Sequence, residues 1–320
     1  MKKSPPVVYV HIKDSPVLGL IILIFSGDYL VKGAVGIAEK FKISPLVIGM
    51  TVVSFGTSAP ELFVSVKAAL MGSPDLAIGN VIGSNIANLA LVLSITVLIF
   101  PIIVERNSKF IDWPMMMFAS ILFFVFSLDN LITMIEGLIL IAILTVFIIF
   151  LIRNSRKSNL HLDEDIDGTP SNFPLTLLYL FGGLVGLKFG ADWLLDGAIG
   201  LAKSFGMTEK VIGVTIVAFG TSVPELVASG FAAYKKQTDI SIGNLIGSNI
   251  FNIMIVIGIT AVITPIQVAE SAMSFDIYWM LGISLALYPM MFIGKKMGRI
   301  HGVILLTAYV TYIVLCLHSI

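Results

Sequence analysis

The segment GMTVVSFGTSAPE at residues 49–61 returns almost unchanged as GVTIVAFGTSVPE at residues 213–225. The two copies are 164 residues apart, and each lies in a run that is otherwise as apolar as a helix facing lipid. The polar and conformationally special residues of the first copy all reappear in the second. They are Gly56, Thr57, Ser58, Pro60 and Glu61, followed by Gly220, Thr221, Ser222, Pro224 and Glu225. This repetition predicts an internal duplication.

A second pair of segments keeps the same offset. DLAIGNVIGSNIANLALVLSI begins at Asp75, and DISIGNLIGSNIFNIMIVIGI begins at Asp239. The shared small and polar residues are Gly79, Asn80, Gly83, Ser84, Asn85 and Asn88, matched by Gly243, Asn244, Gly247, Ser248, Asn249 and Asn252. The duplicated blocks therefore extend over residues 49–96 and 213–260.

The composition predicts a protein that crosses a membrane several times. Of the 320 residues, 57% are hydrophobic and only 12% are charged, whereas soluble proteins have about 25% charged residues. The 20 basic and 20 acidic residues balance, so nothing indicates nucleic acid as a partner. The lone Cys316 excludes an internal disulfide framework and a cysteine-based zinc site. The apolar run 17–25 lacks a cleavage pattern, so we expect it to belong to the first membrane span.

Since a span needs roughly 20 mostly apolar residues, the sequence predicts an all-α membrane protein with ten transmembrane helices. Their expected limits are 17–38, 44–69, 78–101, 113–128, 131–151, 173–200, 209–233, 241–264, 275–293 and 299–318. The stretch RNSRKSNLHLDEDIDGTPS, from residue 153, is the only long polar one. The expected organisation is a tail at 1–16, a five-helix repeat at 17–152, a polar linker at 153–172 and a second five-helix repeat at 173–320.

An odd number of spans per half predicts the orientation of the two halves. With five spans each, the second copy enters the membrane from the opposite side, and such inverted repeats are typical of secondary transporters with a site near the bilayer midplane. If both termini are outside, the inside loops hold twelve basic residues and the outside loops between spans hold two. Lys2, Lys3 and Lys13 in the tail oppose this bias without outweighing it. We therefore expect a multi-pass protein of the cell membrane with a cytoplasmic linker.

The repeated prolines predict free backbone oxygens at the same depth as a carboxylate. A proline inside a helix cannot bond the carbonyl four residues earlier, so Pro60 should free the carbonyl of Gly56, and Pro224 that of Gly220. Further oxygens are expected on the same helix faces at spacings of three or four. They belong to Ser54, Thr57 or Ser58, Glu61 and Ser65, and to Thr221 or Ser222, Glu225 and Ser229. Ligands that are all oxygen suit hard cations such as Ca²⁺ or Na⁺.

The second block adds a polar stripe at four-residue spacing. Its members are Asn80, Ser84 and Asn88, with Asn244, Ser248 and Asn252 in the other copy. Carboxamide oxygens from this stripe could complete a cation cage, or the stripe could serve only to bond helices together. Two further charged pairs, Asp28 with Lys32 and Lys188 with Asp192, lie one turn apart within spans and predict structural ion pairs.

Charge alone makes exchange of cations plausible. The carboxylates of Glu61 and Glu225 carry a charge of −2, which one Ca²⁺ or two Na⁺ neutralise, and buried like charges repel when the site is empty. A Ca²⁺/H⁺ antiporter is the nearest alternative, because protons would also discharge the pair. A hydrolase that uses Ser58 or Ser222 lacks a nearby histidine, and a channel is a further alternative. We expect no enzyme activity, no cofactor beyond the transported ions, and no protein partner.

The paired GTSAPE and GTSVPE segments, each followed by GSNI, resemble the sodium/calcium exchanger family of the cation/calcium exchanger superfamily, and the ten-span layout extends the resemblance over the chain. By that resemblance Glu61 and Glu225 are the central ligands of Ca²⁺ and Na⁺. The other implied ligands are Thr57, Ser58, Thr221, Ser222, Ser84, Asn88, Ser248 and Asn252. It also implies that the first and sixth spans slide across the other eight, and that a third Na⁺ makes transport electrogenic.

Two positions depart from that family's pattern. Ser54 stands where many relatives carry a small apolar residue, as Ala218 still does here, which bears on one peripheral sodium site. Asn252 occupies a position that is Asp in the potassium-dependent branch, so the resemblance implies transport without a requirement for K⁺.

Overall fold

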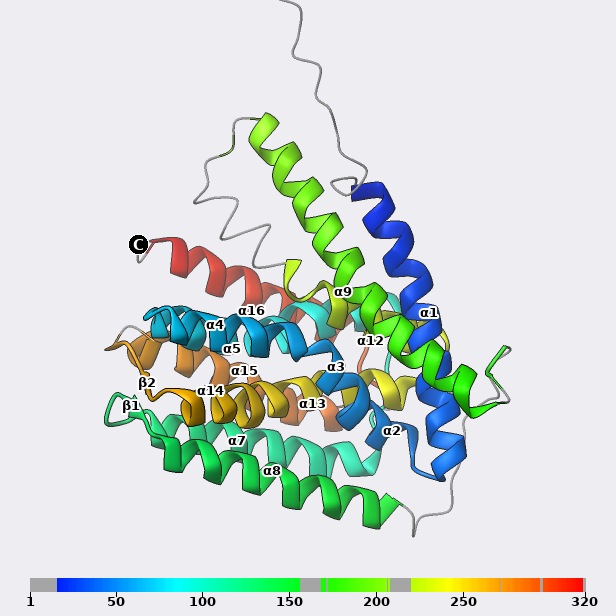
Figure 1. Ribbon diagram of the computed structural model, residues 1–320, viewed down its shortest axis with the longest axis horizontal. Helices are drawn as coiled ribbons and strands as arrows, with labels where there is room; N and C mark the ends of the chain where they lie inside the picture. Colours follow the sequence, from blue (N-terminus) through cyan, green and yellow to red (C-terminus); the bar gives the residue numbers. More distant parts are fainter. Residues whose placement is uncertain are drawn as a thin grey trace, which may run out of the picture.

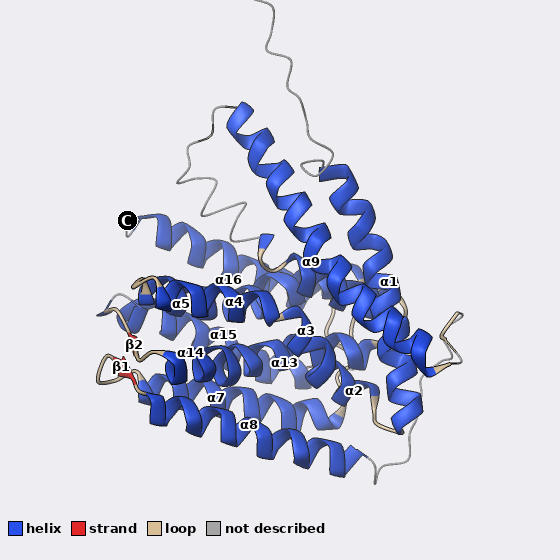
Figure 2. Cartoon of the chain, viewed as in Figure 1, coloured by secondary structure: helices blue, strands red, loops and turns tan. Residues whose placement is uncertain are grey.

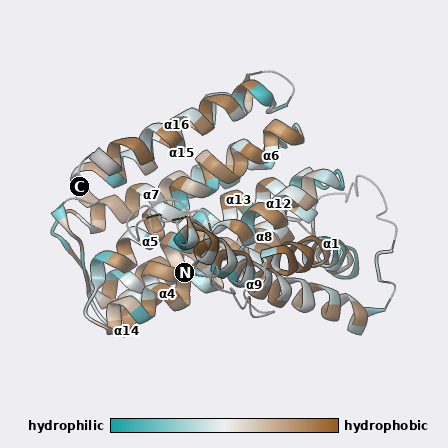
Figure 3. Cartoon of the chain, turned by 90° about the horizontal axis from the view of Figure 1, so that it is seen from above, coloured by the Kyte–Doolittle hydropathy of each residue, from teal (hydrophilic) through white to brown (hydrophobic). Residues whose placement is uncertain are grey.

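The structure is a computed structural model, which describes residues 16–155, 168–170, 172–205, 207, 220–270, 272–293 and 296–318. Nearly all of these residues are helical (Figure 2), and hydrophobic residues predominate along most of the helices (Figure 3). Most helices lie side by side in one bundle, while α1 (Pro16–Phe41) and α9 (Phe173–Ser204) cross it obliquely as a pair (Figure 1). The expected all-helical membrane protein is confirmed.

The helical segments follow one another with short breaks, and several contain a stretch of π-helix, labelled η. The first half contains α1, α2 (Pro45–Ile48), η2 (Gly49–Val53), α3 (Ser54–Thr57), α4 (Ala59–Leu70), α5 (Pro74–Ala87), η3 (Asn88–Val92), α6 (Leu93–Ile99), η4 (Ser108–Asp112), α7 (Trp113–Phe126) and α8 (Met134–Ser155). The second contains α9, α12 (Val223–Tyr234), α13 (Thr238–Phe251), η6 (Asn252–Ile257), α14 (Gly258–Ile263), η7 (Ala272–Asp276), α15 (Ile277–Phe292) and α16 (Arg299–His318).

Among the described residues, eight helices are long and apolar enough to cross a membrane. The pair Pro45–Thr57 and Ala59–Leu70 passes the same test as one broken span, with a bend of 43° between its parts. The expected span 209–233 is described only from residue 220 onward, where α12 runs to Tyr234. The number ten therefore stays a prediction.

Several helices begin earlier than their hydropathy suggests. The spans expected from 78, 113, 241 and 275 begin at Pro74, Ser108, Thr238 and Ala272. The polar residues in these first turns made them look like loops. Asp75 and Asp239 lie in the first turn of α5 and α13, where a carboxylate is favourable beside the positive end of the helix.

A short antiparallel ribbon was not expected from the sequence. β1 (Leu131–Ile132) pairs with β2 (Ile266–Gln267), with Ile132 opposite Ile266, so the span predicted from 131 starts only at Met134. Ile102 and Met297 form a second bridge, with amide to carbonyl distances of 2.9 and 2.8 Å. These pairs satisfy backbone groups at the ends of spans, where an unpaired amide or carbonyl is costly.

The ribbon and the bridge join equivalent loops of the two halves. Ile102 and Ile266 are separated by the 164-residue offset of the repeat, and each pairs with a loop of the opposite half. Helices of the two halves also pack against each other: α14 packs against α8, and α16 packs against α6. The two halves of the chain are thus interlocked.

Helices α1 and α9 approach each other closely through glycines. A Cβ atom on Gly33 would lie 2.5 Å from the backbone nitrogen of Leu180, and one on Gly183 would lie 2.7 Å from that of Leu30. No side chain fits at such distances, so glycine is required there. α1 and α9 therefore form one closely packed pair.

Candidate cation-binding site

The first duplicated segment forms a broken helix. α3 ends at Thr57, and Ser58 leaves the helical conformation with φ −87° and ψ 0°. α4 begins at Ala59, which places Pro60 in its first turn, where a missing amide hydrogen costs nothing. The break expected beside Pro60 is present, but it lies two residues before the proline, at Ser58, and Pro60 belongs to the first turn of the next helix.

The second segment repeats this geometry where it is described. Ser222 has φ −92° and ψ 3°, and α12 begins at Val223 with Pro224 in its first turn. The amide of Leu62 donates to the carbonyl of Ser58 at 3.2 Å, and the amide of Leu226 donates to the carbonyl of Ser222 at 3.0 Å. Ala218 lies outside the described residues.

Each new helix carries a buried glutamate in its first turn. Glu61 is 2% exposed and Glu225 is 1% exposed. Both carboxylate oxygens of Glu225 and Oε2 of Glu61 lack a hydrogen-bond partner among the described residues. The two carboxylates are close enough to repel each other electrostatically. Burying an unpaired carboxylate costs free energy, so two of them together attract cations strongly.

The side chains of the serines at the two breaks resemble the glutamates in burial and in hydrogen bonding. The hydroxyls of Ser58 and Ser222 are buried and have no hydrogen-bond partner among the described residues. Thr57, in contrast, uses its hydroxyl to reach α13, at 3.3 Å from Oδ1 of Asn244 and 3.4 Å from Oγ of Ser248. Thr221, its counterpart in the second repeat, also makes an interaction. The break of the first repeat therefore faces the second block of the other repeat.

The polar stripe of the second block is buried where α5 and α13 give way to π-helix. Asn88 begins η3 and Asn252 begins η6, and π-helical turns often occur at functional sites. Both side-chain polar atoms of Asn88 and Oδ1 of Asn252 lack a hydrogen-bond partner among the described residues. Ser84 and Ser248 lie one turn earlier, also buried.

Asn80 and Asn244 hold helices together. Nδ2 of Asn80 lies 2.9 Å from Oγ of Ser65, and Nδ2 of Asn244 lies 2.9 Å from Oγ of Ser229. Asn80 also donates to the carbonyl of Glu61 at 3.2 Å. These bonds fix the helix that carries each glutamate to the helix that follows it. Ser65 and Ser229, expected as cation ligands, are acceptors for these asparagines.

Ser54 also has a packing contact. Its hydroxyl donates to the carbonyl of Gly49 at 2.7 Å and contacts the carbonyl of Asn244 at 3.1 Å. A Cβ atom on Gly247 would clash with this hydroxyl, so the glycine of α13 makes room for it.

Asn85 is a residue whose role the sequence did not indicate. It accepts a hydrogen bond from Nδ2 of Asn252 at 3.1 Å, and its own Nδ2 lies 3.4 Å from the carbonyl of Asn249. It thus joins α5 to the opposite repeat. The repeated GSN tripeptide was the available signal, since Asn85 and Asn249 recur in both copies.

The expected ion pairs within spans are confirmed. Lys32 lies 2.8 Å from Asp28, and Lys188 lies 2.5 Å from Asp192. The structure adds a third member to the first pair, because Lys235, just after α12, also contacts Asp28. α1 is thereby connected to the turn between α12 and α13.

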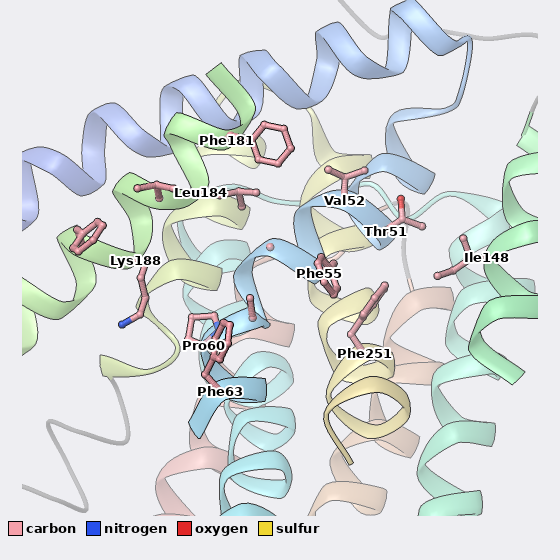
Figure 4. Close-up of a pocket in the computed structure, with 14 residues that line it drawn as sticks. Thr51, Val52, Phe55, Pro60, Phe63, Ile148, Phe181, Leu184, Lys188 and Phe251 are labelled. Atoms are coloured by element: carbon pink, nitrogen blue, oxygen red, sulfur yellow. The ribbon is translucent and has the colours of Figure 1, made fainter. Parts of the chain in front are cut away.

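An apolar groove of about 800 Å³ runs beside the first break, between α9 and the α3–α4 segment. Figure 4 shows Phe181, Leu184 and Lys188 of α9 on one side of it, with Phe55 and Pro60 on the other. α9 touches both breaks, because a Cβ on Gly56 would meet Leu184 and one on Gly220 would meet Leu195. Neither glutamate lines this groove, which is therefore distinct from the buried site.

The comparison with known proteins agrees with this geometry. The family model described as sodium/calcium exchanger protein matches residues 16–153 and 175–318. The sodium/calcium exchanger MaX1 of Methanosarcina acetivorans is 33% identical, over 93% of this chain and 96% of that protein. A candidate antiporter of Alkalimonas amylolytica, CaxA, is 37% identical over 92% of this chain and 95% of that protein.

Solved structures show the same similarity in three dimensions. The sodium-calcium exchanger NCX_Mj, soaked with zero Na⁺ and Ca²⁺, matches with a TM-score of 0.81 at 32% identity. The match covers 93% of this chain and 96% of that one. The broken helices, their buried glutamates and these similarities have one common explanation: the chain belongs to the sodium/calcium exchanger family of membrane transport proteins.

Proposed function

We propose that this protein is a secondary antiporter that exchanges Ca²⁺ for Na⁺ by alternating access at a site built on Glu61 and Glu225. The observation that carries the proposal is the burial of both carboxylates without hydrogen-bond partners for three of their four oxygens. Ionised carboxylates inside a protein need compensating charge. A pair with charge −2 is compensated by one Ca²⁺ or by two Na⁺, so the two ions compete for the same site.

The repulsion between the two carboxylates explains why transport is coupled. In the low-dielectric interior an empty site leaves two like charges facing each other, so reorientation without a bound ion is unfavourable. The protein then changes sides only with Ca²⁺ or with Na⁺ bound, which is antiport. A third Na⁺ would leave a net charge of +1 and make the exchange electrogenic.

The remaining ligands would be neutral oxygens. We assign this role to the residues around the glutamates at the two breaks and on the two π-helical turns: Thr57, Ser58, Thr221, Ser222, Ser84, Asn88, Ser248 and Asn252. Unpartnered oxygens on Ser58, Ser222, Asn88 and Asn252 support the assignment. Ser54 and Ala218 would flank a peripheral sodium site. Ser54 is the weaker candidate, since its hydroxyl already bonds a carbonyl of its own helix.

We further propose ten spans arranged as two inverted five-helix repeats, with the site near the midplane. The pairing of equivalent loops across the halves supports this symmetry. The excess of basic residues in alternate loops supports an orientation with both termini outside and the linker 153–172 in the cytoplasm. The membrane would be the cell membrane.

A Ca²⁺/H⁺ antiporter is the second candidate, because the same unpartnered carboxylate oxygens could take up protons. The intramembrane hydrolase considered from the sequence has no support, since the family consists of exchangers.

Competition between ions for the purified protein tests the shared site. Calorimetric titration with Ca²⁺ should show an affinity that falls steeply as NaCl replaces choline chloride at constant ionic strength and pH. A Ca²⁺ affinity that is independent of Na⁺ but falls as the pH falls would favour the proton-coupled alternative. A Ca²⁺ affinity that is independent of both Na⁺ and pH would contradict a shared site.

A further inference from the structure

A third buried carboxylate lies apart from the two glutamates in the sequence. Asp112, at the end of η4, is 1% exposed. Neither of its oxygens has a hydrogen-bond partner among the described residues. The Ser108 hydroxyl, one turn earlier, faces the carboxylate but is outside hydrogen-bonding geometry. None of the ion pairs within the described ranges includes Asp112.

This carboxylate lines a small, mostly enclosed cavity of about 40 Å³. Its polar lining residues are Ser44 before α2, Asn107 and Asp112 at η4, and Asn154 and Ser155 at the end of α8. A cavity needs roughly 10–15 Å³ to hold one water-sized particle. There is therefore room for one ion beside the carboxylate, and the exposed Asn107 gives a path from the end of the bundle.

The duplicated half provides an internal comparison. Asp276 occupies the equivalent position, at the end of η7, and accepts a hydrogen bond from the Tyr312 hydroxyl at 3.0 Å. Cys316 also approaches it, at 3.8 Å. At the equivalent positions of the first half stand Ile148 and Ile152, which have no donor. Asp112 thus lacks the donors that satisfy its counterpart and faces a cavity instead.

From this difference we propose that the cavity beside Asp112 binds one monovalent hard cation, Na⁺, at a site separate from the transport site. The available ligands are the carboxylate and the amide and hydroxyl oxygens of Asn107, Asn154 and Ser155, all oxygen, which suits a hard cation. A single carboxylate balances one positive charge. A divalent ion would leave an uncompensated positive charge among Leu46, Val47 and Leu151.

An ion in this position would connect three segments. The amide of Ser44 already donates to Oγ of Ser155 at 2.6 Å, which holds the start of α2 to the end of α8. From α2 the chain continues through η2 into α3, which carries Ser54 and Thr57. Na⁺ bound at Asp112 would therefore fix the base of the helix that leads to the first break.

Thermal unfolding of the full-length protein tests the proposal. In a Glu61→Gln/Glu225→Gln background, which removes the transport-site charge, the midpoint is compared in NaCl, KCl and choline chloride at equal ionic strength. At saturating Na⁺ we expect a rise of about 5 °C. Asp112→Asn should abolish this rise, and Asn154→Ala should require more Na⁺ to produce it.

Asp276→Asn is the matched control, because it changes the equivalent carboxylate that already has its donor. This variant should keep the full Na⁺ shift even if its midpoint is lower. Equal midpoints in the three salts would overturn the proposal. A Na⁺ shift that survives Asp112→Asn would overturn it as well.

Discussion

Nδ2 of Asn252 donates a hydrogen bond to Oδ1 of Asn85 at 3.1 Å, where the π-helical turn after α13 meets α5 of the opposite repeat. Both side chains are buried. Because the nitrogen of Asn252 is held by Asn85, its Oδ1 is oriented away and has no partner among the described residues. Asn252 can therefore offer a cation a neutral oxygen, and the charge of the central site stays at −2.

This arrangement predicts exchange without a requirement for K⁺. Ca²⁺ uptake driven by a Na⁺ gradient should be equally fast in KCl and in choline chloride when the membrane potential is clamped. Asn252→Asp adds a third negative charge and should make uptake depend on K⁺, whereas Asn85→Asp should not. A strict K⁺ requirement in the unaltered protein would refute the charge count.

The glutamate pair predicts a large loss from a single amide substitution. Glu61→Gln or Glu225→Gln removes half of the site's charge while keeping its shape. Losing one charged ligand of a buried ion costs about 3 kcal/mol or more, which is about a hundredfold in affinity. Exchange measured with ⁴⁵Ca²⁺ should fall by at least that factor, while the protein still inserts and elutes as a folded species.

Glu136→Gln is the control for that experiment. Glu136 accepts hydrogen bonds from Thr133 at the start of α8, at 2.7 and 2.8 Å, away from the site. The same chemical change there should leave exchange near its original rate. Wild-type exchange in either glutamate variant would show that the ions do not share this site.

The sequence located the glutamates because their whole neighbourhood is duplicated at a fixed offset. It also indicated the helices and the ion pairs within them, since hydropathy and one-turn spacing are local properties. It did not reveal that Asn85 bonds Asn252 or that Lys235 reaches Asp28. Those contacts depend on where helices of different halves cross. The sequence predicted a break beside Pro60 but not its position at Ser58, because a proline suits both the interior of a kinked helix and the first turn of a new one.

The ion pair between Asp28 and Lys235 predicts an effect on rate. The residue equivalent to Lys235 in the first half is Met71, so this ion pair has no counterpart in the other half. If α1 moves during transport, Lys235→Met should release it. A partly exposed ion pair contributes about 0.2–1 kcal/mol, so exchange should accelerate by up to about fivefold.

A double-mutant cycle isolates that contact. Lys235→Met and Asp28→Asn should each change the exchange rate, and the double variant should behave like Asp28→Asn alone, because that substitution already removes the contacts of Asp28 with both Lys235 and Lys32. Additive effects would mean that the two residues act separately.

The orientation predicts the side on which the linker 153–172 is accessible. In a Cys316→Ala background, in which the Tyr312 hydroxyl still bonds Asp276, a Ser158→Cys variant should react with an impermeant maleimide only after the cells are permeabilised. A Ser4→Cys variant should react in intact cells. The reverse pattern would invert the proposed topology and leave the duplication unaffected.

The most direct test of Na⁺-coupled exchange is ⁴⁵Ca²⁺ uptake by proteoliposomes that contain only this protein. Uptake is measured with an outward Na⁺ gradient at equal pH, and then with an outward proton gradient without Na⁺, both at clamped potential. We predict rapid uptake with the Na⁺ gradient, none with the proton gradient, and none in Glu61→Gln/Glu225→Gln. Uptake driven by protons alone, or uptake that needs neither gradient, would contradict the proposed exchange of Ca²⁺ for Na⁺.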